Sequence, residues 1–166
     1  MEAIEKLCNI EEIRSLRVKY AHYLDGNNLE NLTGLFTEDT IVQTDREPWI
    51  GRNGVLEGLR KAFRDYDTNQ HGNYPFMHAI TNHWIEFTGP TTAQGRCYLI
   101  DLVTARPKDQ NPLLLLGLYS DEYKQISGKW YISRSRLDVI WPERNVEGGE
   151  PGKNLSLPTQ TLKGGF

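Results

Sequence analysis

The stretch LLLLGLYSDEYKQISGKWYISRSRLDVIW, residues 113–141, decides the fold. Apolar and β-branched side chains alternate with polar ones on both sides of Ile126-Ser-Gly-Lys129, which has the composition of a hairpin turn. The pattern predicts two long strands, Leu113–Gln125 and Lys129–Trp141.

A second pair of strands precedes this hairpin. Met77–Phe87 and Thr92–Val103 also have a period of two, and Thr88-Gly-Pro-Thr91 suits the turn between them. Arg106–Pro112 is polar and predicts a longer loop to the next strand.

The N-terminal part of the chain follows the helical period instead. Asn9 and Glu12 have the spacing of a capping box, so a first helix is predicted from near Ile10 to Asp25. Its expected buried stripe is Ile13, Leu16, Tyr20, Tyr23 and Leu24. The remaining predictions here are a short helix Leu29–Phe36, a strand Thr40–Thr44, a turn Trp49–Gly54 and a third helix with Val55, Leu59 and Phe63 inward.

Helices followed by long antiparallel strands predict an α+β fold. We expect a cone-shaped α+β barrel, with the N-terminal helices packed in the concave face of a strongly curved, mainly antiparallel sheet and an apolar pocket between them. Residues 1–141 are predicted to form one domain, and the Gly/Pro-containing residues 142–166 a C-terminal tail.

Composition narrows the function classes. The 166 residues are 38% hydrophobic and 25% charged, as in a soluble globular protein, and the net charge of −3 with no basic cluster argues against a nucleic-acid partner. Cys8 and Cys97 form no disulfide framework or metal-binding pair. No apolar run is long enough for a membrane span, and the N-terminus lacks a signal-peptide pattern, so a cytoplasmic location is expected.

Asp25 and His78 are the first chemical candidates. Asp25 lies at the end of the first predicted helix, where the negative end of the helix dipole disfavours a carboxylate, and His78 begins a strand. A carboxylate that orients a histidine makes a general base suited to neutral pH. The alternatives are an ordinary turn at Asp25-Gly26 and a hydrogen-bonded structural histidine.

Asp101 and Tyr20 are the second pair of candidates. Asp101 falls on the mainly apolar face of its strand, where a carboxyl group favours its protonated form and could assist a leaving hydroxyl, unless a salt bridge or bulge intervenes. Tyr20 shares the apolar stripe of the first helix, so its ring belongs to the core while its hydroxyl could serve as an acid. For both residues, a purely structural role and a catalytic role remain alternatives.

Other histidines and aromatic residues complete the set. Asn82 shares His78's parity and is expected to help position substrate, whereas His83 is expected to face outward. Tyr119 and Trp141 are expected in the core or pocket wall, with Trp141 closing the mouth. No metal-binding, nucleophile or phosphate-loop motif is present, so no metal and no cofactor are expected.

The order of elements resembles the nuclear transport factor 2-like superfamily and, more narrowly, its SnoaL-like branch, which includes scytalone dehydratase, bile-acid 7α-dehydratase and lindane dehydrochlorinase. The residues that carry the resemblance are Ile13–Tyr20, Tyr23-Leu-Asp25, Leu35–Asp39, Gly51-Arg52, His78, Thr81-Asn82, Glu86-Phe87, Gly117–Tyr123 and Gly128–Trp130.

The resemblance implies that Asp25 and His78 form a catalytic dyad, with Tyr20 and Asp101 as further site residues. An arginine that the bile-acid dehydratase carries on its last strand falls at Val139 here, so Val139 is expected beside the substrate and an anionic substrate is disfavoured. The expected function is a cofactor-independent lyase or isomerase acting on a small cyclic, aromatic or steroid-like molecule. The alternatives are a noncatalytic ligand-binding protein and a structural small subunit of an oxygenase. A homodimer or homotrimer is expected, with no membrane partner.

Overall fold

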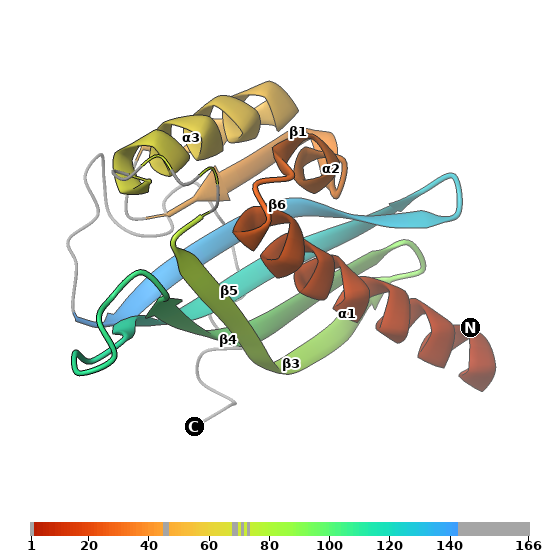
Figure 1. Cartoon of the computed structure of the whole chain (residues 1–166). Coiled ribbons are helices and arrows are strands. Elements are labelled where there is room, and N and C mark those ends of the chain that lie inside the picture. The colour runs from red at the N-terminus through yellow and green to blue at the C-terminus, as the bar shows by residue number, and fades with distance from the viewer. Residues whose placement is uncertain (1, 45–46, 68–69, 71, 73, 143–166) are drawn as a thin grey trace.

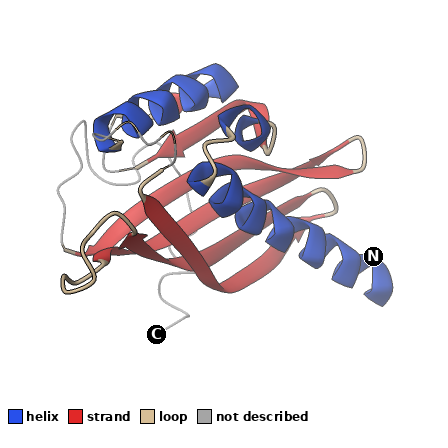
Figure 2. Cartoon of the chain, in the orientation of Figure 1, coloured by secondary structure: helices blue, strands red, loops and turns tan. Residues whose placement is uncertain are grey.

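A computed structural model describes residues 2–44, 47–67, 70, 72 and 74–142. Its helices are α1 (Ala3–Asp25), α2 (Leu29–Thr33) and α3 (Gly51–Tyr66) (Figure 2). Its strands are β1 (Phe36–Gln43), β2 (Trp49–Ile50), β3 (Phe76–Gly89), β4 (Thr92–Val103), β5 (Leu113–Ile126) and β6 (Lys129–Trp141). Apart from Pro142, the predicted tail lies outside the described residues.

The described strands form a six-stranded sheet in the order β2-β1-β6-β5-β4-β3. Neighbouring strands are antiparallel except β1 and β6, which are parallel. The sheet curves around α1, which crosses its concave side, while α3 lies over β1 (Figure 1). The predicted α+β fold with helices inside a curved, mainly antiparallel sheet is confirmed.

The start of α1 corrects the predicted capping box. The helix begins at Ala3, with Glu2 and Glu5 forming the box. Asn9 and Glu12 instead bind β6: Asn9 Oδ1 accepts the indole N–H of Trp130 at 3.0 Å, and Glu12 Oε1 accepts the Trp130 backbone N–H at 3.0 Å. The two residues that have the spacing of a local capping box therefore bind Trp130, which lies more than a hundred positions later in the sequence.

The segment after α1 also differs from the prediction. The second helix ends at Thr33, and β1 begins at Phe36 because this residue pairs in parallel with Ile132 of β6. Trp49 and Ile50 pair with β1, so the predicted turn contains a short strand. The four later strands match their predicted ranges to within two residues.

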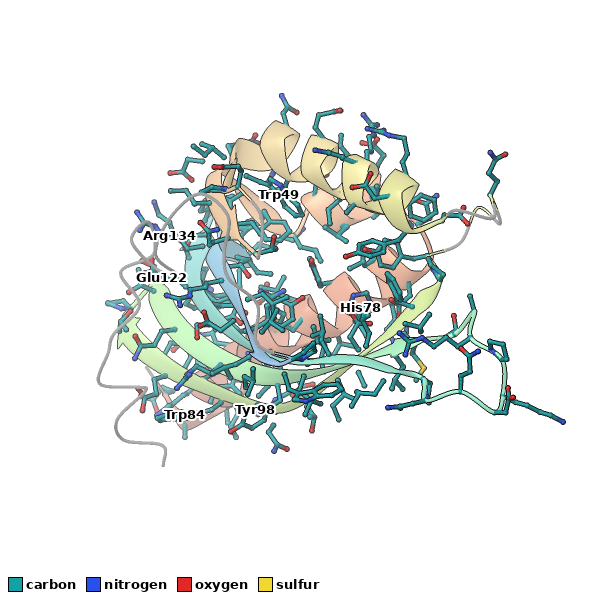
Figure 3. All side chains as sticks on the ribbon, turned by 90° about the vertical axis from the view of Figure 1, so that its left-hand side faces the viewer. Trp49, His78, Trp84, Tyr98, Glu122 and Arg134 are labelled. Atoms are coloured by element: carbon teal, nitrogen blue, oxygen red, sulfur yellow. The ribbon has the colours of Figure 1, made fainter. Side chains whose placement is uncertain are left out.

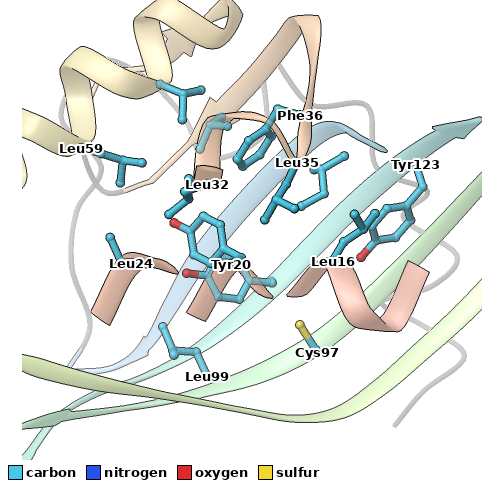
Figure 4. Close-up of a cluster of buried hydrophobic side chains, with 14 of the residues drawn as sticks. Leu16, Tyr20, Leu24, Leu32, Leu35, Phe36, Leu59, Cys97, Leu99 and Tyr123 are labelled. Carbon is cyan, nitrogen blue, oxygen red and sulfur yellow. The ribbon is translucent and has the colours of Figure 1, made fainter. Parts of the chain in front are cut away.

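The inward face of α1 forms the centre of the core. Ile13, Leu16, Tyr20 and Leu24 are buried as expected, and Tyr20 lies between α1 and the sheet above Leu99 (Figure 4). Tyr23 is only partly buried. The largest departure is Arg17, a charged residue on the same face that is 0% exposed.

A β-bulge in β3 reverses the predicted parity of its second half. Thr81 pairs with Tyr98 and Trp84 with Arg96, so three steps on β3 match two on β4. Asn82 sits at this bulge with a φ of 53° and is exposed. The expected placement of Asn82 on His78's face is therefore wrong, and so is the outward placement of His83, which points into the concave side.

The convex face of the sheet carries exposed apolar side chains, among them Trp84. Tyr98 lies beside Trp84 and also points away from the concave side (Figure 3). The predicted homo-oligomer stays a prediction.

Substitution of Asn82 tests the bulge. We expect Asn82→Gly to leave the free energy of unfolding nearly unchanged, because glycine adopts positive φ without steric cost. Asn82→Val should lower it by about 1–2 kcal/mol, because a β-branched residue is strained in the left-handed region. Urea unfolding of both variants measures the difference, and equal stabilities would contradict a left-handed residue at this position.

Candidate active site

Asp25 joins the end of α1 to the start of β3. Its Oδ2 accepts the backbone N–H of His78 at 3.1 Å, and its Oδ1 lies 2.5 Å from His78 Nδ1. The helix ends there because Gly26 and Asn27, the latter with a φ of 53°, turn the chain away. Two hydrogen bonds from His78 offset the unfavourable position of a carboxylate at a helix C-terminus.

Asp101 lies on the other side of the His78 ring. The two residues are register partners on β3 and β4, and Asp101 Oδ2 is 3.7 Å from His78 Nε2. Counting back from the Gly89–Thr92 pair without irregularities would place His78 opposite Val103. Two register shifts, one at Asn82 and one near the turn, bring Asp101 opposite instead.

The hydrogen-bond pattern fixes the histidine's tautomer. An ionised carboxylate can only accept hydrogen bonds, so the contact with Asp25 requires the proton of a neutral His78 ring on Nδ1. The lone pair is then on Nε2, on the side of Asp101. The side chain of His78 is 6% exposed, so bulk solvent has little access to this ring.

A cavity lies beside the dyad between α1, α3 and the sheet. About 80 Å³ of it is open to the centres of water molecules. Figure 3 shows His78 and Trp49 on the interior side of the sheet. The polar groups that line the cavity are Tyr20, Thr44, Tyr66, Tyr74, His78, Asp101 and Tyr119. The apolar lining residues are Leu24, Trp49, Leu59, Ala62, Phe76, Leu99, Leu114, Leu115, Leu137 and Val139.

An aromatic group covers one end of this cavity. Tyr74 packs against His78 with ring centroids 5.7 Å apart, and against Phe76 at 4.9 Å. Tyr66 completes the group, with its ring 4.8 Å from that of Phe76. Rings in such edge and tilted contacts form a rigid wall that suits a flat ligand.

Two tyrosines line the cavity from opposite elements. Tyr20 comes from α1 and Tyr119 from β5, and their rings meet edge to face at 6.1 Å. Burial raises the pKa of Tyr20, while Arg17 and a hydrogen bond with Tyr119 oppose this rise. Burial likewise raises the pKa of Tyr119 well above its ordinary value. Both hydroxyls are therefore protonated at neutral pH and can donate hydrogen bonds.

The remaining predicted residues divide into two groups. Val139 and Tyr119 line the cavity. Asn82 and Trp141 do not, and Trp141 is 48% exposed. Trp141 lies outside the cavity because β6 contains a bulge. Gly117 pairs with Val139 but Leu116 pairs with Trp141, so Ile140 is the extra residue. Trp141 therefore shares the face of the exposed Leu116.

A buried polar network behind the cavity was missed at the sequence level. The Nε of Arg17 donates to Asp121 Oδ2 at 2.6 Å, its Nη2 binds Asp121 Oδ1 and Ser135 Oγ, and both charged side chains are 0% exposed. Tyr123 donates to Asp121 at 2.8 Å, and His83 Nε2 lies 3.1 Å from the Tyr123 hydroxyl. The only available signal was a charge at helical spacing from Ile13, Tyr20 and Leu24.

Among the described residues, no group of three His, Cys, Asp or Glu side chains is placed to hold a metal ion. None of the described helices is long and apolar enough to cross a bilayer. Burial raises the pKa of the Cys97 thiol to about 12, so this cysteine is not a thiolate nucleophile.

The model of the SnoaL-like domain matches residues 5–136, which is most of the chain. The chain belongs to the SnoaL-like family. The match includes Tyr20, Asp25, His78, Asp101 and Tyr119 and ends before Val139. It thus covers the dyad and the two tyrosines.

Solved structures of other proteins share the fold. A candidate scytalone dehydratase from Novosphingobium aromaticivorans is 23% identical, with a TM-score of 0.69 over 90% of this chain and 99% of that chain. A hexachlorocyclohexane dehydrochlorinase of the LinA type from Novosphingobium barchaimii is 16% identical, with a TM-score of 0.70 over 84% and 92%. A candidate aromatic ring hydroxylase from Novosphingobium aromaticivorans is 24% identical, with a TM-score of 0.63 over 78% and 87%. At these identities the likeness shows the fold alone.

The partly buried His83 predicts that the protein loses stability in acid. Burial lowers the pKa of His83 from 6.5 to about 4, so the folded state favours the neutral ring. Its contribution is present above pH 6.5 and is lost as the pH falls from 6.5 toward 4, because the unfolded chain binds the proton more readily. The loss should reach up to about 3 kcal/mol.

Urea unfolding of the wild type and His83→Gln at about pH 7 and about pH 4.5 measures this contribution. We expect the wild type to lose more stability than the variant, in which an amide keeps a donor for Tyr123. Equal losses would show that His83 is not held neutral by the fold.

Proposed function

We propose that this protein is a cofactor-independent lyase or isomerase that removes a proton from a carbon atom of a small, neutral cyclic or aromatic molecule. The observation that carries the proposal is the 2.5 Å contact between Asp25 Oδ1 and His78 Nδ1, which leaves the Nε2 lone pair as a base on the side of Asp101 and the cavity. This is the geometry that general-base catalysis needs.

In the proposed reaction, His78 Nε2 takes a proton from the carbon next to a carbonyl group. The imidazolium that forms is stabilised by Asp25 at one nitrogen and Asp101 near the other. Tyr20 donates a hydrogen bond to the enolate oxygen while Tyr119 donates to the Tyr20 oxygen, so the two protonated hydroxyls act as a chain.

Elimination then follows from the enolate. Its electron pair forms the carbon–carbon double bond as the bond to a β-hydroxyl group breaks, and the hydroxyl leaves as water by taking a proton from the His78 imidazolium. If no leaving group is present, return of the proton to another carbon completes an isomerisation instead. Both outcomes use the same base.

The lining of the cavity supports a neutral substrate. No lysine or arginine is among the described lining residues, and Val139 occupies the wall where the bile-acid dehydratase pattern has an arginine. Two carboxylates, Asp25 and Asp101, flank His78. A substrate carboxylate would enter this site without a cationic partner, at a large desolvation cost.

Turnover of neutral β-hydroxy ketones with one ring or two fused rings tests the role of His78 as the base. We expect enone formation, followed by absorbance, and deuterium uptake at the α-carbon from heavy water. His78→Ala should lower kcat/KM by at least about 10²-fold, since it removes the base, and Asp25→Asn should also lower it by disturbing the tautomer. His22→Ala, a substitution at an exposed position of α1, is the matched control.

If His78→Ala retained the kcat/KM of His22→Ala on such a ketone, the assignment of the base would be wrong. If the ketones bound without turnover or deuterium uptake, a noncatalytic binding protein would be the better explanation. Stable copurification with a larger iron-containing chain would favour the oxygenase small subunit.

Substrate charge gives a separate prediction. We expect a ketone from this panel to bind at least about tenfold more tightly than the same ketone carrying a carboxylate, because the cavity offers no cation to the carboxylate. Isothermal titration calorimetry on His78→Ala, which blocks turnover, measures both affinities. Equal or tighter binding of the carboxylate would contradict the neutral-substrate proposal.

A further inference from the structure

Arg17 places a fixed positive charge behind the two cavity tyrosines. Its guanidinium carbon lies 3.9 Å from the centroid of the Tyr119 ring and 4.8 Å from that of Tyr20. The side chain is 0% exposed and does not line the cavity, so a substrate in the cavity meets the two tyrosines and not the guanidinium.

The partner of Arg17 orients this charge. Asp121 binds the Nε and Nη2 atoms, while Nη1 has no hydrogen-bond partner among the described residues. The ring of Tyr119 is close to the centre of the guanidinium. The ion pair is thus a dipole whose cationic end is the nearer one to the tyrosines.

Further groups hold the pair in place. Ser135 accepts from Arg17 Nη2, and Tyr123 donates to Asp121 at 2.8 Å. Gly95 makes room for this arrangement, since a Cβ there would lie 3.1 Å from the Tyr123 ring and 3.2 Å from His83 Nε2. A charge fixed this firmly needs no reorganisation when negative charge develops nearby, which is the condition for electrostatic catalysis.

We propose that Arg17 is a positioning residue that acts through Tyr20 and Tyr119, making this hydrogen-bonded pair of hydroxyls a stronger donor to the oxygen of the bound substrate. This inference rests on the proposed function. A cation over the face of a phenol ring withdraws electron density and favours charge on its oxygen. Arg17 thereby offsets part of the acidity that burial takes from these hydroxyls.

Site-specific 3,5-difluorotyrosine at position 20 or 119 measures the effect without a substrate. Its ionisation is followed by fluorine NMR in the full chain. In Arg17→Met/Asp121→Asn, which removes both charges together, we expect the acidity of the label to fall at least about tenfold, or one pKa unit. A label at Tyr98, on the convex face, is the control and should not change.

Asp121→Asn alone gives an independent test with the opposite sign. It removes the anion and leaves the cation, so the label at position 20 should become more acidic, while an amide oxygen can still accept from Arg17 and Tyr123. Thermal unfolding of each variant shows whether it is folded, and an unchanged label in folded Asp121→Asn would overturn the electrostatic coupling of the ion pair to Tyr20.

The activity of the same variants separates this inference from the proposed function. On a ketone that the wild type dehydrates, Arg17→Met/Asp121→Asn should lower kcat at least about tenfold with little change in KM, because the lost interaction is strongest in the transition state. Unchanged acidity of the labels at both positions would overturn the role of Arg17, even if His78→Ala were inactive. Shifted labels with a fully active His78→Ala would instead leave the role of Arg17 intact and overturn the base.

Discussion

The ion pair between Arg17 and Asp121 sets the rotation of α1 inside the sheet. Both side chains are 0% exposed, and breaking such a pair would leave a buried charge without compensation, typically at a cost of about 3–5 kcal/mol. Once Arg17 faces β5, helical geometry directs Tyr20 and Leu24 to the same side. Asp25 then follows at the end of the helix, within reach of His78. The site therefore depends on a contact that no substrate touches.

Three groups of contacts attach α1 along its length. Asn9 and Glu12 bind Trp130 near the N-terminal half, Arg17 binds Asp121 in the middle, and Asp25 binds His78 at the end. Together these contacts join polar residues of α1 to three strands, β6, β5 and β3. Apolar packing alone tolerates small rotations, whereas hydrogen bonds fix direction. This explains how a dyad with one member on a helix and the other on a strand keeps a 2.5 Å contact.

Irregularities in the strands place the rest of the site. The bulge at Asn82 lets His78 and His83 both face inward although they are an odd number of residues apart, and it helps to bring Asp101 opposite His78. The bulge at Ile140 leaves Val139 in the cavity and turns Trp141 out. A flat, regular sheet from the same sequence would have exchanged the roles of several of these side chains, because each inserted residue reverses the face of all that follow.

The sequence by itself determined the main helices, the four long strands and the α+β class, because periodicity and turn motifs are local. The pairing of Asp25 with His78 came from the family resemblance. The helical and strand periods alone also predicted that Tyr20 and Asp101 lie among the buried apolar residues of their elements. Asn82, His83 and Trp141 were misplaced because a bulge is a cooperative property of two paired strands and leaves little trace in either one. Arg17 escaped notice because a charge becomes stable in a core only when a distant partner, here Asp121, meets it, and only the tertiary structure decides that meeting.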